Sequence, residues 1–197
     1  MKTLSDIKEL KGKRVLVRVD FNIPVENGII LDDFRIKKTL PTIEKLRNQG
    51  AKVILMSHFK NNGDDSLKPV WRYLRTFFPV SFIEDIFSED SKKTVDGMAN
   101  AEVVLLENLR HWKEEKENDK KFAKHLASFA DVYVNEAFSS SHREHASIVG
   151  VPKYIKGYAG DLFVQEVENL KKGSSPKKPF LFVDRKSTRL NSSHLVI

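Results

Sequence analysis

Side chains suited to binding an anion recur along this 197-residue chain, most of them directly after short apolar segments. A guanidinium group binds phosphate or carboxylate oxygens through two parallel N–H groups, whereas Asp20 and Asn22 could hold a hydroxyl. Such residue types favour a small phosphorylated hydroxy acid as ligand. The cationic members are Arg35, Arg110, Arg143, His58, His142 and His145.

Each of these residues also has a plainer interpretation. Taken singly, Asp20 and Asn22 are more typical of turn and helix-cap positions. Arg110 could form a weak surface ion pair with Glu107 or Glu114. The functional interpretation therefore depends on a fold that brings the residues together.

The segments that would position these side chains alternate between two patterns. β-Branched and apolar runs predict six strands, at 14–19, 53–56, 80–83, 103–106, 132–134 and 180–183. Apolar residues at helical spacing predict helices within 36–50, 67–77, 122–129 and 163–173. The alternation indicates an α/β fold with a doubly wound parallel six-stranded sheet and helices on both faces. Four polar clusters would then share the edge formed by the carboxyl ends of the strands.

The composition excludes several classes of site. The chain has no cysteine, which excludes disulfides and thiolate metal sites, and the histidines at 142 and 145 lack a third zinc ligand. No apolar run approaches the roughly 20 residues of a membrane span. We therefore expect a soluble, cytoplasmic protein without a membrane partner or a bound metal, and a monomer.

A basic nucleic-acid-binding module is the alternative function. It is suggested by the formal net charge of +7 and by Trp71, Tyr73 and Trp112, which stand near basic residues. Their spacing is more typical of a core, and no nucleic-acid motif is present, so we expect no nucleic-acid partner. The Gly-rich phosphate-binding motifs are also absent, and the charged run 113–121 predicts a solvated helix start.

Residues 184–197 carry neither strand nor helix periodicity. We interpret them as a non-native tail, with an ordinary disordered tail as the alternative, and expect one domain over 1–183.

Several motifs contain the polar residues named above, and in order and spacing they resemble phosphoglycerate kinase from residue 1 to about 183. They are Val17-Arg18-Val19-Asp20-Phe21-Asn22-Ile23-Pro24, Asp33-Phe34-Arg35-Ile36, Ser57-His58-Phe59, Leu105-Leu106-Glu107-Asn108-Leu109-Arg110, Asn135-Glu136-Ala137-Phe138 and His142-Arg143-Glu144-His145.

The resemblance implies the N-terminal half of a two-domain glycolytic kinase. That half would hold 3-phosphoglycerate or 1,3-bisphosphoglycerate, while a C-terminal half, absent here, would hold Mg-ADP or Mg-ATP. Arg35 would face the transferring phosphoryl group as the catalytic residue. We expect binding of 3-phosphoglycerate, no nucleotide or metal on this segment, and no turnover by this chain alone. The implied substrate-binding residues are Asp20, Phe21, Asn22, Arg35, His58, Phe59, Lys60, Asn61, Arg110, His142 and Arg143.

The chain departs from the family pattern at three places. His-Leu-Gly-Arg-Pro is replaced by His58-Phe59-Lys60-Asn61-Asn62, so Asn61 stands where an arginine is expected, and Lys60 could partly replace it as a point charge. Ser139, Ser141 and Glu144 replace small residues. After Val183 the family continues Leu-Gly-Gly-Ala-Lys, whereas this chain continues with Asp184.

Overall fold

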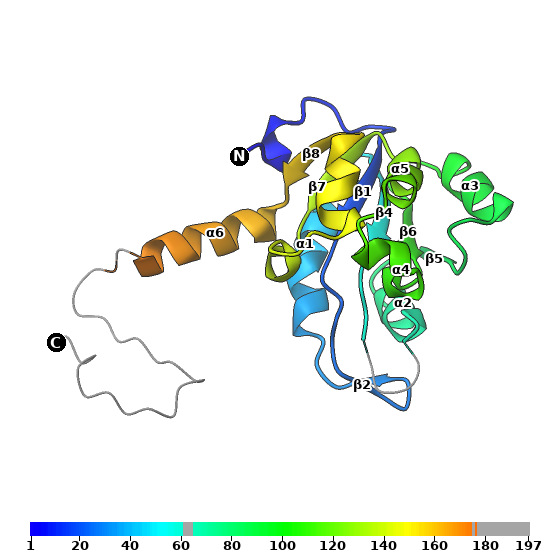
Figure 1. Ribbon diagram of the computed structural model, residues 1–197, viewed down its shortest axis with the longest axis horizontal. Helices are drawn as coiled ribbons and strands as arrows, with labels where there is room; N and C mark the ends of the chain where they lie inside the picture. The colour runs from blue at the N-terminus through cyan, green and yellow to red at the C-terminus, as the bar shows by residue number, and fades with distance from the viewer. Residues whose placement is uncertain (61–64, 175, 177–197) are drawn as a thin grey trace. The chain divides into compact units, whose positions relative to one another are not determined.

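The computed structural model describes residues 1–60, 65–174 and 176 (Figure 1). The chain divides into two compact units, residues 1–164 and residues 165–197. The sheet lies entirely in the first unit. Asn61, the strand expected at 180–183 and the tail at 184–197 lie outside the described residues.

The regular elements follow one another in the expected alternation of strand and helix. The strands are β1 (Arg14–Arg18), β2 (Val25–Glu26), β3 (Ile29–Ile30), β4 (Lys52–Met56), β5 (Val80–Ile83), β6 (Val103–Leu106), β7 (Val132–Asn135) and β8 (Lys156–Ala159). The α-helices are α1 (Phe34–Asn48), α2 (Lys68–Leu74), α3 (Glu89–Asp96), α4 (Lys113–Lys116), α5 (Lys120–Ser128) and α6 (Asp161–Ser174). Short 3₁₀ turns occupy Leu4–Asp6, Leu109–His111, Phe138–Ser140 and Val151–Lys153, and one π-helical turn spans Ala146–Gly150.

Six strands form one sheet in the order β5-β6-β4-β1-β7-β8, and all five neighbouring pairs are parallel. The expected six-stranded parallel sheet is therefore confirmed, with five strands where the sequence predicts them. The sixth strand, β8, was not predicted. It is short, contains Gly157 and has no β-branched residue, so it carries no strand signal.

The sheet separates two hydrophobic cores, because successive residues of a strand face opposite sides. In β1, Val15 and Val17 belong to the first core and Leu16 to the second. Helices α1 and α2 cover the first face, and α3, α5 and the turn at 146–150 cover the second, as Figure 1 shows for α1 and α5. The expectation of helices on both faces is thus confirmed.

The aromatic residues near basic side chains belong to these cores, as the core interpretation predicts. Trp71 and Tyr73 pack against the first core and Trp112 against the second. The indole Nε1 of Trp71 donates to the carbonyl of Val80 at 2.8 Å, on β5 at the edge of the sheet. The indole occupies one acceptor position of an edge carbonyl that another strand would need, so Trp71 helps to protect this edge.

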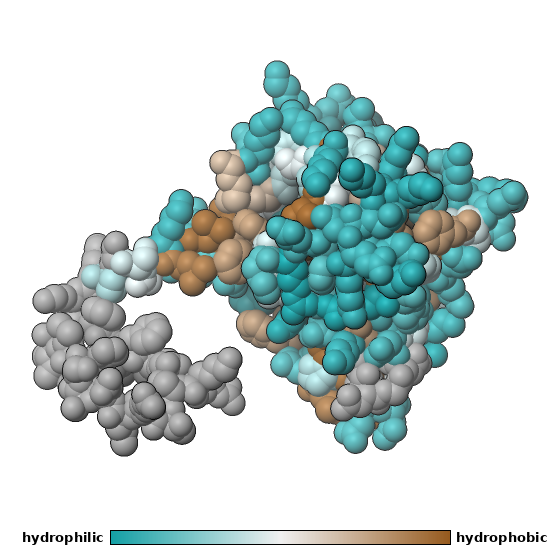
Figure 2. All heavy atoms as spheres, in the orientation of Figure 1, coloured by the Kyte–Doolittle hydropathy of each residue, from teal (hydrophilic) through white to brown (hydrophobic). Residues whose placement is uncertain are grey.

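The charged run 113–121 is mostly helical, and it is exposed or half-buried at every residue but one, largely as the sequence predicts. It contains α4 and the start of α5, which begins after the N-cap Asp119. The side chains over α4 and α5 are mainly hydrophilic on the face seen in Figure 2. Glu115 is the exception: it is fully buried, so the prediction of a solvated segment is wrong at this residue.

Candidate anion-binding site

The loops that follow β1, β4 and β6 are tied to one another at the carboxyl edge of the sheet. The hydroxyl of Ser57, just after β4, accepts from the Phe21 N–H at 2.9 Å, and its carbonyl accepts from the Leu109 N–H at 3.1 Å. Asn108, just after β6, bonds both the N–H and the carbonyl of Phe59 at 2.9 Å. These bonds fix the three loops that carry the candidate residues.

Phe21 and Phe59 enter this site only through their backbone. Both side chains are buried in the first core, with exposed fractions of 0% and 1%. Both N–H groups are already bonded, to Ser57 and Asn108 respectively. They place the neighbouring polar side chains and offer an anion no side-chain donor.

Asp20 is the centre of a bonded polar group. Its Oδ2 accepts from Arg35 Nη1 at 2.6 Å and from the hydroxyl of Ser139, and its Oδ1 accepts from the Asn22 N–H at 3.1 Å. The side-chain oxygen of Asn22 accepts from the Lys60 N–H at 2.9 Å. Asp20 and Asn22 thus form a turn with each other, and they also bond to residues of other loops.

Ser139 is a member of this group that the sequence did not predict as a site residue. In the sequence Ser139 stands out only as a replacement for a small residue, because a single serine gives no signal of its hydrogen-bond partner. Its bond to Asp20 joins the loop after β7 to the loop after β1.

His58 is buried and bonded to the guanidinium of Arg18. Arg18 Nη2 lies 2.9 Å from His58 Nδ1. Burial, followed by the charge of Arg18, lowers the pKa of His58 from 6.5 to about 3. Because an arginine can only donate, Nδ1 is the acceptor and the ring hydrogen of the neutral histidine is on Nε2. His58 is therefore a neutral donor, and the prediction that it is a cation is wrong.

Arg110 and Arg143 supply positive charge to the same place. Burial lowers the pKa of Arg110, and the charge of Arg143 is the second cause. The charges of both arginines also lower the pKa values of His58 and His145, after burial. Arg110, Arg143, His58 and His145 therefore lie within electrostatic reach of one another, which supports one common crevice.

Arg110 keeps hydrogen-bonding capacity that the described part of the chain does not use. Its Nε is buried and has no hydrogen-bond partner there. The alternative of a surface ion pair with Glu107 or Glu114 is not found among the described residues. Glu107 instead accepts from the Ser66 hydroxyl at 2.6 Å and the Leu67 N–H at 2.7 Å. A buried, unsatisfied donor on a cation is the kind of group that an anion would complete.

The other predicted residues are exposed or lie outside the described residues. His142 is exposed, and Lys60 is exposed at the start of a stretch that is not described. Asn61, where the family pattern has an arginine, lies outside the described residues.

Arg18, Glu115 and Ser147 are further members that the sequence did not single out. All three are fully buried. The available signals were a charged residue inside an apolar strand and a glutamate within a charged run, and neither identifies its partners.

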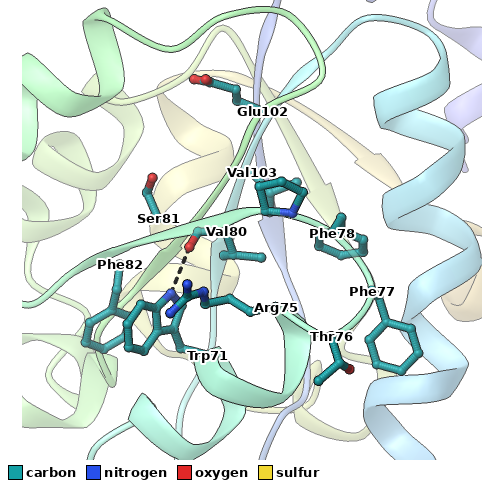
Figure 3. Close-up of a pocket in the computed structure, with 11 residues that line it drawn as sticks. Trp71, Arg75, Thr76, Phe77, Phe78, Val80, Ser81, Phe82, Glu102 and Val103 are labelled. Carbon is teal, nitrogen blue, oxygen red and sulfur yellow. Dashed lines mark hydrogen bonds between the residues drawn. The ribbon is translucent and has the colours of Figure 1, made fainter.

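The described residues hold no cluster of metal ligands, and a hollow lies away from the anion site. Within the described ranges, no group of three or more histidine or acidic side chains is arranged to hold a metal, and no helix there is long and apolar enough to cross a bilayer. A hollow of about 720 Å³ lies where β5 and β6 begin (Figure 3). Because the strands are parallel, this is the opposite edge of the sheet from the loops that carry Arg110 and Arg143. The lining of the hollow includes Trp71, Arg75, Phe77, Phe82 and Glu102.

Comparisons with known proteins agree on one family. The family model for phosphoglycerate kinase matches residues 4–184. The chain is 49% identical to the phosphoglycerate kinase of Dictyoglomus turgidum over 191 residues, which cover 92% of this chain and 48% of that protein. With the phosphoglycerate kinase of Leptospira biflexa the identity is 46% over 188 residues, or 91% and 48% of the two chains.

Solved structures give the same result. Phosphoglycerate kinase from Pyrococcus horikoshii superposes with a TM-score of 0.82 at 33% identity, and that from Coxiella burnetii with 0.78 at 36%. Each match covers 90% of this chain and 46% of the solved chain. The chain thus spans about half the length of the relatives it matches.

Proposed function

This chain belongs to the phosphoglycerate kinase family, and we propose that it is the substrate-binding half of such an enzyme, with 3-phosphoglycerate or 1,3-bisphosphoglycerate as its ligand. The observation that supports the proposal is the mutual electrostatic influence of Arg110, Arg143 and His58, which come after the carboxyl ends of parallel strands. The family membership supplies the identity of the phosphorylated acid.

The phosphate of the ligand is assigned to Arg110, Arg143 and His58. Arg110 and Arg143 form no ion pair with any described residue, and Arg110 Nε is buried and unsatisfied. A phosphate would neutralise the two guanidinium charges and accept from both as well as from His58 Nε2. His142 and Lys60, both exposed, would add positive charge at the rim.

The glycerate end of the ligand is assigned to Asp20 and Asn22. Asp20 would accept from the substrate hydroxyl, in place of one of its present donors. The side-chain oxygen of Asn22 already accepts from the Lys60 N–H. The side-chain NH₂ group of Asn22 therefore remains as the donor for the ligand. Arg35, now paired with Asp20 at 2.6 Å and about half exposed, would turn toward the transferring phosphoryl group.

Catalysis would require the part of the family that this chain does not match. In the full enzyme a phosphoryl group would pass from the C1 acyl phosphate of 1,3-bisphosphoglycerate to ADP, with Mg²⁺ supplied with the nucleotide by the other half. The residues described here would bind and orient the acid, and Arg35 would neutralise charge on the moving group. We expect no turnover from these 197 residues, and a coupled ATP-formation assay tests this.

The boundary of this half is also a proposal. We place it at residue 183 and treat 184–197 as a non-native tail. Sequencing the genomic locus past the codon for Val183 tests this, because a continuation into Leu-Gly-Gly-Ala-Lys would establish that the tail is foreign, and the present tail in the genome would refute it.

Binding is tested by calorimetric titration of 3-phosphoglycerate into the 197-residue chain. We expect saturable binding that weakens by at least about tenfold in Arg110→Ala, since one charge-assisted phosphate contact is worth about 1.5–3 kcal/mol. Arg75→Ala is the matched control, because Arg75 is exposed at the opposite edge of the sheet. An equal loss of affinity in both variants would show that the effect comes from net charge alone, and the assignment of Arg110 to the phosphate would fail.

A further inference from the structure

Arg18 is a buried cation whose guanidinium nitrogens are all bonded. Its side chain is fully buried, with Nε donating to the Ser147 hydroxyl at 2.9 Å, Nη1 to the carbonyl of Val19, and Nη2 to His58 at 2.9 Å. A guanidinium taken out of water needs a compensating charge, because its desolvation costs several kcal/mol.

Glu115 supplies that charge through Ser147. The Ser147 hydroxyl donates to Glu115 Oε1 at 2.5 Å, and the Ser147 N–H donates to Oε2 at 2.9 Å. Glu115 is fully buried, and its charge is the strongest of those that favour the charged form of Arg18. His145 Nδ1 lies 3.9 Å from Oε1, so a second imidazole adjoins the same carboxylate.

The directions of these hydrogen bonds are determined. Arg18 can only donate, so the Ser147 oxygen accepts from it and the Ser147 hydrogen points to Glu115. Both oxygens of Glu115 then act as acceptors, as in an ionised carboxylate. Burial raises the pKa of Glu115, whereas Arg18 and the two bonds from Ser147 lower it. These four residues form a relay centred on Arg18, which donates to His58 on one side and to Ser147 on the other, and Ser147 in turn donates to Glu115.

We infer that Glu115 is a positioning residue of the anion site: through Ser147 it holds the Arg18 guanidinium, and Arg18 keeps His58 in the tautomer whose Nε2–H can donate to a phosphate. Glu115 itself would not touch the ligand. The inference rests on the proposed function for the identity of the ligand, but the relay can be measured without any ligand.

The experiment compares Glu115→Gln and Ser147→Ala with Glu117→Gln, using the 197-residue chain. Glutamine keeps the size of Glu115 but removes its charge and one acceptor, and alanine removes the hydroxyl link. Glu117 is an exposed glutamate at the end of the same helix, so its variant makes the same charge change outside the relay.

The first readout is the ¹⁵N spectrum of the His58 ring without ligand. We expect the native chain and Glu117→Gln to show one neutral tautomer with hydrogen on Nε2 near pH 7. Glu115→Gln and Ser147→Ala should show a mixture of the two tautomers, while circular dichroism shows a retained fold. A retained single Nε2–H tautomer in both folded variants would overturn the inference.

The second readout is the affinity for 3-phosphoglycerate. We expect a loss of about tenfold in both relay variants, the effect of one poorly oriented hydrogen bond to a charged group, and no change in Glu117→Gln. If the native chain binds no 3-phosphoglycerate, the proposed function fails, and the ring spectra still decide whether the relay exists.

Discussion

Replacing His58 with asparagine should remove a specific part of the acid sensitivity of this chain. Asparagine places an oxygen near the position of His58 Nδ1, so Arg18 keeps an acceptor, but the titrating ring is gone. In the folded chain the pKa of His58 is lowered from 6.5 to about 3, first by burial and then by Arg18. Unfolding restores the ordinary value, so below about pH 6.5 the unfolded chain binds a proton that the folded chain does not.

The size of the effect follows from the two pKa values. A group with a lowered pKa of this kind stabilises the fold fully above its unfolded pKa and loses that contribution as pH falls toward the folded value. The interval from the unfolded pKa of 6.5 down to pH 5 is about 1.5 units, and each unit is worth about 1.4 kcal/mol. Between pH 7.5 and pH 5, His58 therefore lowers the free energy of unfolding by about 2 kcal/mol.

The assay is urea unfolding followed by circular dichroism at pH 7.5 and pH 5, for the native chain, His58→Asn and the control His111→Asn. His111 is exposed. We expect the free energy of unfolding to fall by about 2 kcal/mol more in the native chain than in His58→Asn, and by a similar amount in the native chain and the control. Burial raises the pKa values of Glu115 and Glu136, which opposes this trend, but both remain in every variant and cancel in the difference. Identical losses in the native chain and His58→Asn would refute the buried, neutral His58.

Two further substitutions test the packing around the sheet. A Cβ at Gly160 would overlap the carboxyl group of Glu136, so Gly160→Ala should destabilise the fold by about 2–3 kcal/mol. Gly173→Ala is the control, because a Cβ there meets nothing within 4 Å. Equal unfolding midpoints for the two variants would contradict the overlap. Trp71→Phe removes the bond to the Val80 carbonyl at the sheet edge and should cost about 1 kcal/mol, measured by thermal unfolding against the native chain; an unchanged midpoint would show that this bond contributes nothing.

Much of the fold could be predicted because its signals are local. The strands β1, β4, β5, β6 and β7 are short runs rich in apolar and β-branched residues, and the long helices repeat apolar residues at helical spacing. The hairpin of β2 and β3 was not predicted, although its turn residues Asn27 and Gly28 both have positive φ, at 50° and 77°. Asn-Gly is a strong hairpin signal, and it was missed because each strand has only two residues.

In the candidate site, some residues could likewise be predicted from the sequence and others could not. Asp20, Arg110 and Arg143 could be named from the sequence, because they come after strands whose carboxyl ends must share one edge. Arg35, in the first turn of α1, was named together with them, and its role came from the family resemblance. The buried relay could not be named, since Glu115 and Ser147 are brought to Arg18 only by tertiary packing, and in the sequence Glu115 resembles its exposed neighbours. The neutral state of His58 likewise follows from burial and from Arg18, which no spacing reveals.

Binding at the carboxyl edge of the sheet can be mapped most directly by amide chemical shifts as 3-phosphoglycerate is added to the ¹⁵N-labelled chain. We expect saturable shifts concentrated at 20–22, 58–60, 108–110 and 138–144, with the hollow around Trp71 and Arg75 unaffected. Shifts that gather at that hollow, or that spread over the surface and vanish with added salt, would contradict binding at this edge.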